Sequence, residues 1–229
     1  MRIVFIHGLF RAILDPPEGW WCPALPGYSE SQLSPATLPD AVEFIASNCD
    51  GKLHIVGHSI GGAIAVMLAS RYPARVASVI NIEGNFTLKD AFWSSRLAQM
   101  SAEEADAELA GFRADPSAWL TNTGVPPTPQ SIAIARWSLA TPARTIQSMA
   151  RSVVEITSQP DYLEQVRQIL DRGIPFHLIA GEHSRAGWDV PDFVLARAAS
   201  FQIEPNAGHM LMLNDQAAFT ALVEKAAGK

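Results

Sequence analysis

A serine stands between glycines at the end of an apolar run, in the sequence IVGHSIGGA (residues 55–63). The apolar run predicts a buried strand and the residues from Gly61 onward predict a helix, so Ser59 lies on the turn between them. A side chain at Gly57 or Gly61 would clash in so tight a turn. A serine raised above the edge of a parallel sheet, at the start of a helix, is positioned to act as a nucleophile. Simple capping of the helix is the structural alternative.

A serine hydroxyl is a poor nucleophile without a base that takes its proton. The chain has six histidines. His209, in EPNAGHMLML, follows the last predicted strand and precedes the last predicted helix, and Gly208 lets the backbone turn the imidazole toward Ser59. We therefore predict that His209 is the base. The other five are less suitable: His7 ends the first strand, His54 and His177 fall inside strands, His58 neighbours the serine but should point away from it, and His183 lies in a loop.

Short runs rich in β-branched residues alternate with helical patterns and would position these side chains. Strands are predicted at residues 2–6, 53–57, 76–82, 174–181 and 199–204, with a short one within 19–25. Helices are predicted at 38–48, 61–72 and 215–227. This alternation favours an α/β fold of three layers, in which helices cover both faces of a mostly parallel sheet of about six strands.

Between residues 86 and 172 the alternation stops and only helical patterns occur, at 102–114, 129–139, 143–157 and 161–172. We interpret this segment as a helical cap insertion into a core formed by residues 1–85 and 173–229. Aromatic side chains of the insertion are candidates for the lining of an apolar pocket, or they pack the insertion against itself and the sheet. They are Phe86, Phe92, Trp93, Phe112, Trp119 and Trp137.

These features together resemble the α/β-hydrolase fold family over nearly the whole chain. The resemblance rests on HGLF (7–10), GHSIGG (57–62), the insertion, and NAGHMLML (206–213). Residue 2 begins what would be the third strand of the family, so we expect a sheet that lacks the first two. The resemblance implies a serine nucleophile, an acid and a histidine in that chain order.

The acid departs from the common arrangement of the family. Most relatives carry an aspartate a few residues after the strand that matches 174–181, where this chain has Ser184. Haloalkane dehalogenases and the related luciferase instead have a glutamate at the end of the preceding strand, where VINIEGN has Glu83. An unpaired carboxylate there would be costly, so Glu83 needs a partner such as His209. We expect Glu83 to be the acid, with Asp189 and Glu182 as alternatives; a structural Glu83 bonded to backbone amides also stays open.

The dehalogenases use an aspartate nucleophile, so Ser59 argues against dehalogenation. A serine that attacks a carbonyl implies acyl transfer through a tetrahedral oxyanion, which needs hydrogen-bond donors. The resemblance assigns these donors to the backbone N–H groups of Leu9 and Ile60. We predict neither a metal nor a cofactor, because HExxH, paired CxxC and the lysine of a phosphate-binding loop are all absent from the sequence.

The composition excludes other classes of protein. The 229 residues carry a net charge of −6 without a basic cluster, which argues against nucleic acid as a partner. No apolar run reaches the roughly 18 residues of a membrane span, and no secretory signal is recognisable, so we expect no membrane association and a cytoplasmic location. Cys22 and Cys49 are then expected as reduced thiols. A monomer and a homodimer are both open.

The sequence therefore predicts a serine hydrolase that cleaves a carboxylic ester or thioester of a small to medium apolar substrate. Cleavage or lysis of a carbon–carbon bond by the same three residues is an alternative. A protein of the same fold that only binds a ligand is another, and fold-level resemblance does not identify a substrate.

Overall fold

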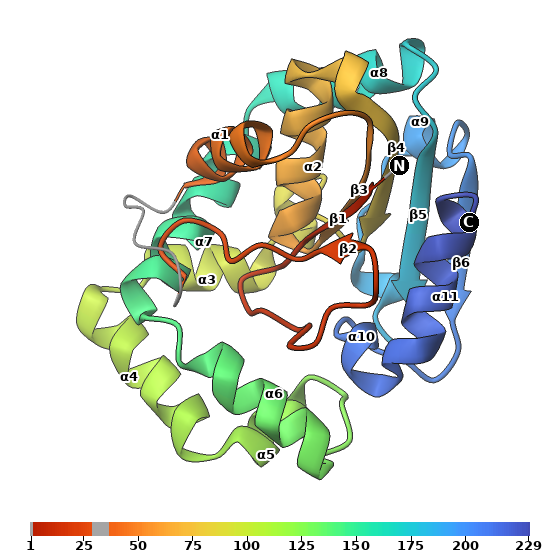
Figure 1. Cartoon of the computed structure of the whole chain (residues 1–229). Coiled ribbons are helices and arrows are strands. Elements are labelled where there is room, and N and C mark those ends of the chain that lie inside the picture. The colour runs from red at the N-terminus through yellow and green to blue at the C-terminus, as the bar shows by residue number, and fades with distance from the viewer. Residues whose placement is uncertain (1, 29–36) are drawn as a thin grey trace.

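A sheet of six strands forms the centre of the computed structural model, which describes residues 2–28 and 37–229 (Figure 1). The strand order is β2-β1-β3-β4-β5-β6, and every neighbouring pair is parallel. The strands are β1 (Arg2–Ile6), β2 (Trp20–Trp21), β3 (Leu53–His58), β4 (Val76–Ile82), β5 (Phe176–Gly181) and β6 (Ser200–Glu204). The predicted parallel sheet is thus confirmed, and the short strand within 19–25 is β2.

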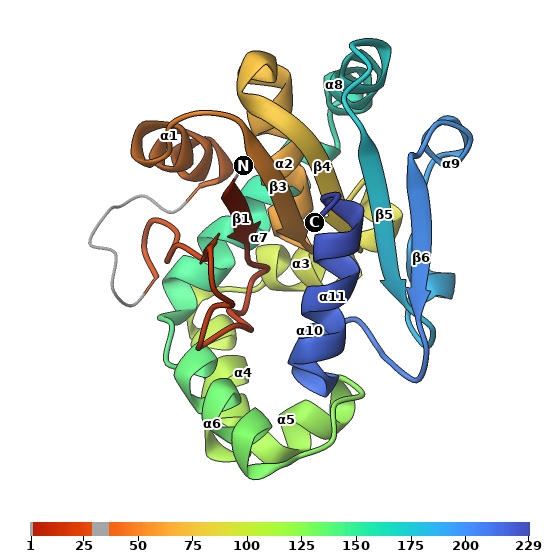
Figure 2. The ribbon, with the colours of Figure 1, turned by 45° about the vertical axis from the view of Figure 1, so that its right-hand side comes forward.

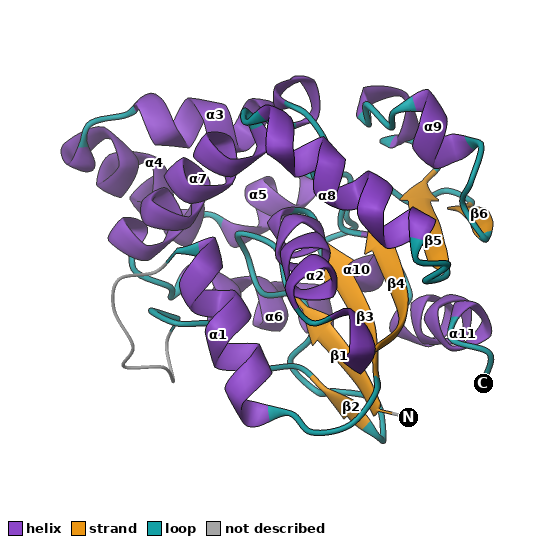
Figure 3. Ribbon diagram, turned by 90° about the horizontal axis from the view of Figure 1, so that it is seen from above, coloured by secondary structure: helices purple, strands orange, loops and turns teal. Residues whose placement is uncertain are grey.

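Helices cover both faces of this sheet. The described helices are α1 (Leu38–Asn48), α2 (Ile60–Arg71), α3 (Phe92–Gln99), α4 (Ala102–Ala114), α5 (Pro116–Asn122), α6 (Pro129–Leu139), α7 (Ala143–Thr157), α8 (Pro160–Asp171), α9 (Asp192–Leu195), α10 (Leu211–Asn214) and α11 (Gln216–Ala226). Seen from above, α1, α2 and α8 lie on one side of the strands and α11 on the other (Figure 3). These three layers are the predicted architecture.

Burial on both faces explains the apolar strands. Every residue of β3 is buried, as are all but one residue each of β1, β4 and β5. On the α11 face, Phe219 packs edge-on against Phe5 of β1 and against Trp20 of β2. Strands enclosed on both faces need continuous apolar residues, whereas the edge strand β6 is partly exposed.

The segment between β4 and β5 contains α3 to α8, so the predicted helical insertion is confirmed as an element of the fold. Helices α4, α5 and α6 lie beyond the carboxyl ends of the strands (Figure 2). Helices α7 and α8 pack against α2 instead. The domain limits at residues 86 and 172 therefore stay a prediction, and residues 1 and 29–36 of the predicted core lie outside the described residues.

Two strand histidines pair with serines of the neighbouring strands. His54 Nδ1 lies 2.8 Å from Ser78 Oγ, and His177 Nδ1 lies 2.8 Å from Ser200 Oγ, which agrees with the structural roles expected for both histidines. Cys22 and Cys49 are free thiols. Among the described residues, no helix is both long enough and apolar enough to cross a bilayer.

Candidate active site

Ser59 occupies a strained turn between β3 and α2. Its backbone angles are φ 54° and ψ −125°, outside the regions that ordinary residues prefer. A Cβ on Gly57 would lie 2.3 Å from the carbonyl oxygen of Gly61, and one on Gly61 would lie 2.2 Å from that of Ile6. Both positions therefore require glycine, as the sequence predicted. The turn presents Ser59 at the carboxyl edge of the sheet, and no hydrogen bond within the described part of the chain engages its hydroxyl.

Positive φ outside glycine is rare in the described residues and occurs at or near the site. The structure describes three non-glycine residues with positive φ: Ser59, Glu83 at 42° and Asn206 at 55°. Glu83 follows β4, and Asn206 lies in the loop that carries His209. Backbone strain persists only where the surrounding structure enforces it, and it is common at functional sites.

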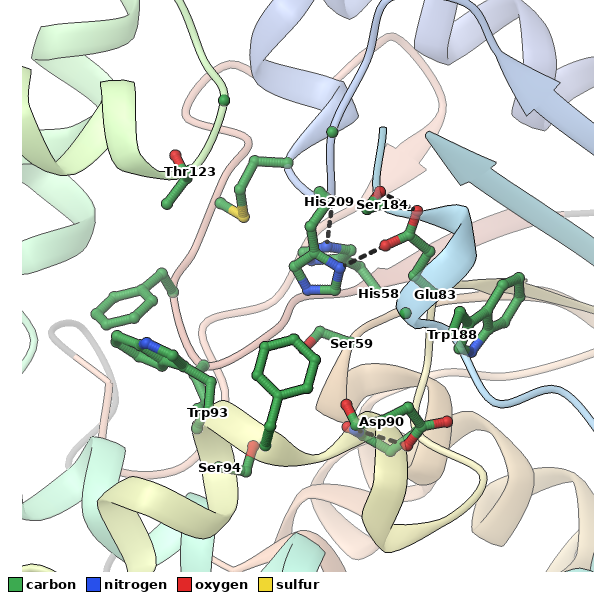
Figure 4. A pocket seen from close by; sticks show the side chains of 18 of the residues that line it. His58, Ser59, Glu83, Asp90, Trp93, Ser94, Thr123, Ser184, Trp188 and His209 are labelled. Atoms are coloured by element: carbon green, nitrogen blue, oxygen red, sulfur yellow. Dashed lines mark hydrogen bonds and ion pairs between the residues drawn. The ribbon is translucent and has the colours of Figure 1, made fainter. Parts of the chain in front are cut away.

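Glu83 and His209 form a close pair beside Ser59 (Figure 4). The Nδ1 atom of His209 lies 2.7 Å from Oε2 of Glu83. The other carboxylate oxygen of Glu83 accepts hydrogen bonds from the Gly181 amide at 2.7 Å and from the Ser184 hydroxyl at 2.6 Å. This contact fixes Nδ1 as the protonated nitrogen of neutral His209 and leaves Nε2 to accept a proton.

The environment of Glu83 keeps it ionised. Its side chain is only 4% exposed, and this burial acts to raise the pKa of the carboxyl group. The hydrogen bonds from His209, Ser184 and Gly181 outweigh burial, so that the pKa of Glu83 lies below its ordinary value. Ser184, at the position where most relatives have their acid, thus donates to an acid that comes from the neighbouring strand.

The two alternative acids lie elsewhere. Asp189 accepts a hydrogen bond from the Thr87 hydroxyl at 2.7 Å and lies 3.9 Å from the Lys89 amine. Glu182 accepts the backbone N–H of Asn206 at 2.9 Å. Of the three carboxylates considered from the sequence, only Glu83 contacts His209.

His58, which we expected to point away from Ser59, lines the same cavity and holds the backbone of the base. Its Nε2–H donates to the carbonyl oxygen of His209 at 2.9 Å, and the two imidazole rings lie 4.7 Å apart. Burial, together with the neighbouring His209, holds the pKa of His58 well below its usual value. Nδ1 of this neutral ring has no hydrogen-bond partner in the described part of the chain. The sequence missed this role because the contact joins residues 151 positions apart.

A second loop approaches Ser59 after β1. His7 is buried, its Nδ1–H donates to the carbonyl oxygen of Gly8 at 2.7 Å, and its Nε2 accepts the Leu25 amide at 3.4 Å. Burial lowers the pKa of His7 to about 3, so the ring is neutral at pH 7. The Tyr28 hydroxyl donates to the carbonyl oxygen of Leu9 at 3.0 Å. The hydrogen bonds in the described residues leave the Leu9 amide unused, and the Ile60 amide is the first of α2.

Leu9, His58, Ser59, Glu83 and His209 line a cavity of about 420 Å³, a size suited to a small-molecule ligand. Its lining includes Phe92, Trp93 and Trp119 of the insertion, as expected, together with Trp188 and the exposed His183. Phe86, Phe112 and Trp137 pack elsewhere: Phe86 stacks on Trp188, Phe112 stacks on Trp93, and Trp137 lies against Arg11. The sequence did not single out Asn85 and Asp90, which also line the cavity.

The arrangement resembles that of a triad in which a carboxylate orients a histidine beside a serine. The described residues contain no cluster of three or more His, Cys, Asp or Glu side chains that could hold a metal ion.

Comparison with known proteins agrees with this architecture. A family model described as "Alpha/beta hydrolase family" matches residues 3–222. No curated protein matches the sequence. Many solved structures are similar, and all those described next are 20% identical or less, which shows the fold alone.

A thermophilic esterase from Thermogutta terrifontis, with malate bound, is 20% identical, with a TM-score of 0.71 over 98% of this chain and 88% of that chain. MenH from S. aureus is 15% identical, with a TM-score of 0.67 over 98% and 92%. The epoxide hydrolase CorEH is 16% identical, with a TM-score of 0.62 over 98% and 89%. The same fold thus carries different reactions in these proteins.

Proposed function

The chain belongs to the alpha/beta hydrolase family, and on that premise we propose that it is a serine hydrolase that cleaves a carboxylic ester or thioester of a small to medium apolar substrate. The observation that carries the proposal is the pair of Glu83 and His209, joined at 2.7 Å beside Ser59 in one cavity. This pairing provides a base in the correct tautomer next to a hydroxyl that accepts or donates no hydrogen bond among residues 2–28 and 37–229.

In the proposed reaction the Ser59 hydroxyl attacks the ester carbonyl while His209 Nε2 takes the hydroxyl proton. The imidazolium that forms is stabilised by the Glu83 carboxylate. The carbonyl electrons move to the oxygen, and the backbone N–H groups of Leu9 and Ile60 donate to this oxyanion. When the tetrahedral species collapses, His209 passes the proton to the leaving alkoxide or thiolate. Water then attacks the acyl-enzyme with His209 as base, and the acid is released.

Two properties of the cavity support an apolar acyl or alcohol group. Most of its larger lining side chains are aromatic or aliphatic, among them Phe10, Trp93 and Trp119. A cavity of about 420 Å³ lies within the range of roughly 300–1,000 Å³ typical of sites for small ligands.

The test is the release of p-nitrophenol from esters of short, medium and long acids by the wild type and by Ser59→Ala. We expect turnover in the wild type that is lost in the variant, together with labelling of Ser59 by a fluorophosphonate. Turnover that persists in Ser59→Ala would refute the proposed nucleophile. If the wild type labels but releases no p-nitrophenol, the serine is reactive and the ester assignment is wrong, which moves the search to carbon–carbon bonds.

A further inference from the structure

One wall of the cavity is polar in a way that the proposed reaction does not use. Asn85 and Asp90 follow Glu83 in sequence and line the same cavity as Ser59 and His209. Asn85 is 4% exposed. In the view of Figure 4, Ser59 lies between Asp90 and His209. The two side chains stand among apolar walls, where a polar group is costly unless it is paired.

The side-chain donor of this polar wall is already engaged. The amide nitrogen Nδ2 of Asn85 has two hydrogens, and it donates to the backbone oxygen of Asp90 at 3.1 Å and to its Oδ1 at 3.3 Å. The backbone amides of Phe86 and Thr87 donate to the Asp90 carboxylate at 3.0 and 3.4 Å. These contacts also hold the carboxylate in place, because Asp90 closes a capping box with Thr87.

Acceptor capacity remains after this accounting. The Oδ1 atom of Asn85 accepts no hydrogen bond from the residues that the structure describes, but it is fully buried behind the cavity surface and therefore not available to a ligand. A carboxylate can accept about four hydrogen bonds, and the Asp90 side chain receives three. Of the two side chains, the Asp90 carboxylate therefore offers an unused acceptor position and the Asn85 amide offers no unused N–H, so this wall complements a ligand group that donates.

The charge of Asp90 also favours a ligand group that donates. Burial, with a smaller contribution from the nearby Asp189, raises the pKa of Asp90 to about 6. The ionised carboxylate is thus poorly stabilised by its surroundings even though three groups donate to it. A donor placed beside it, above all a cationic one, would restore part of the solvation that burial removes.

We propose that the Asp90 carboxylate, held in place by Asn85, forms a subsite that binds a hydroxyl or ammonium group on the substrate whose ester carbonyl is attacked by Ser59. The inference rests on the proposed function and adds the class of substrate. The preferred substrate is amphipathic: an apolar chain lies along the aromatic walls and carries a hydrogen-bond donor at a distance from the ester, whereas a carboxylate at the same point is repelled.

The experiment compares p-nitrophenyl esters of one acyl length whose far end is a methyl, hydroxyl, ammonium or carboxylate group, repeated for short, medium and long acids. For each protein, the readout is the kcat/KM of each ester divided by the kcat/KM of the methyl ester. Partial unfolding of a variant lowers both values equally and leaves this ratio unchanged. At one chain length we expect the hydroxyl or ammonium form to exceed the methyl form by at least about tenfold, and the carboxylate form to fall below it.

Two variants and a control test the residues. Asp90→Asn keeps an acceptor oxygen and removes the charge, so it should remove most of the ammonium preference and less of the hydroxyl preference. Asn85→Ala should reduce both. Thr123→Val removes a hydroxyl from another part of the cavity lining and should leave the ratios as in the wild type. Ratios of one or less at every chain length, or ratios that neither Asp90→Asn nor Asn85→Ala alters, overturn the subsite.

A second measurement does not depend on turnover. Calorimetric titration of the Ser59→Ala variant with hexylamine, hexanol and hexanoate should rank the amine above the carboxylate, and the added change Asp90→Asn should remove that order. Binding of hexanoate as tight as that of hexylamine contradicts the subsite. If instead the esters are not cleaved but the amine is preferred, the proposed reaction fails and the subsite stands.

Discussion

Exchanging Glu83 for glutamine is the sharpest test of the candidate triad, because the change keeps the shape of the side chain and removes only its charge and one acceptor. In the wild type one carboxylate oxygen receives two donors, the Gly181 amide and the Ser184 hydroxyl, and the other faces His209 Nδ1. In Glu83→Gln the amide oxygen must face the Gly181 amide and the Ser184 hydroxyl, because both of these groups donate. The amide NH₂ then faces Nδ1 of the imidazole.

This orientation reverses the tautomer of His209. With an NH₂ group opposite, Nδ1 must act as the acceptor, and the proton moves to Nε2, the atom that should take the proton of Ser59. In a serine protease the same acid-to-amide change lowers kcat about ten-thousandfold. That factor corresponds to about 5.5 kcal/mol at roughly 1.36 kcal/mol per factor of ten. Because the geometry of the pair here is similar, we expect a loss of that order in kcat.

The assay is p-nitrophenyl ester hydrolysis under single-turnover conditions, with Tm measured alongside. Ser184→Ala is the matched control, since it removes one hydrogen bond to the same carboxylate and leaves the tautomer unchanged. A hydrogen bond to a charged group contributes about 1.5–3 kcal/mol, so this control should lose about tenfold to a hundredfold. If Glu83→Gln folds and keeps more than a tenth of the wild-type kcat, the assignment of Glu83 as the orienting acid is wrong.

Three further predictions follow from the contacts around the site. Adding Ser184→Asp to Glu83→Ala should restore part of the lost kcat. The Ser184 hydroxyl lies 2.6 Å from the Glu83 carboxylate, so an aspartate at position 184 would place a new carboxylate close to the lost one. A kcat no higher than that of Glu83→Ala contradicts this. His58→Gln, which keeps an N–H donor, should retain more kcat than His58→Phe, whereas equal values would mean that the ring only fills space. His7 stays neutral when buried, with a pKa of about 3, so below pH 6.5 the unfolded chain binds a proton that the folded chain does not. The free energy of unfolding should therefore decrease as the pH is lowered below 6.5, by about 1.4 kcal/mol per pH unit from this group. Denaturant titrations from pH 7.5 to 5.5 should show a smaller decrease in His7→Asn. Asp90, whose pKa is raised, acts in the opposite sense at lower pH in both proteins.

Elements that are bounded by strong local signals could be predicted from the sequence. The strand at 76–82 and the helices at 38–48, 102–114, 129–139 and 143–157 have the bounds observed in the structure. Three of these helices begin after Thr37, Ser101 or Thr128, each of which caps its helix with a side-chain hydrogen bond.

Some of the described helices were not predicted. α3 begins at Phe92 and α10 at Leu211, both without a side-chain cap, and α5 was missed although Asp115 caps it. The helix predicted at 215–227 is α11, which begins one residue later, at Gln216, because the Asp215 side chain accepts from the amides of Ala217 and Ala218.

The residues of the site also divide into those that the sequence could predict and those that it could not. Ser59, Glu83 and His209 follow strands at positions that a topology alone brings to one edge of the sheet, and residue type then suggests their roles. His58 could not be assigned in this way, because its role is a hydrogen bond to a backbone atom in a distant loop. Asn85 and Asp90 were not identified from the sequence for a related reason. Their proposed role depends on hydrogen-bonding capacity that other contacts leave unused, and this capacity can be recognised only when every contact is known.

The positive φ angles of Ser59 and Glu83 bear on how this protein would respond to directed evolution. Strained residues of this kind cost about 1–3 kcal/mol each, and glycine adopts such angles without that cost. A library screened only for expression or heat resistance would therefore enrich glycine at positions 59 and 83, and would recover folded proteins that have lost the proposed nucleophile and acid. Selection for robustness has to be coupled here to selection for turnover.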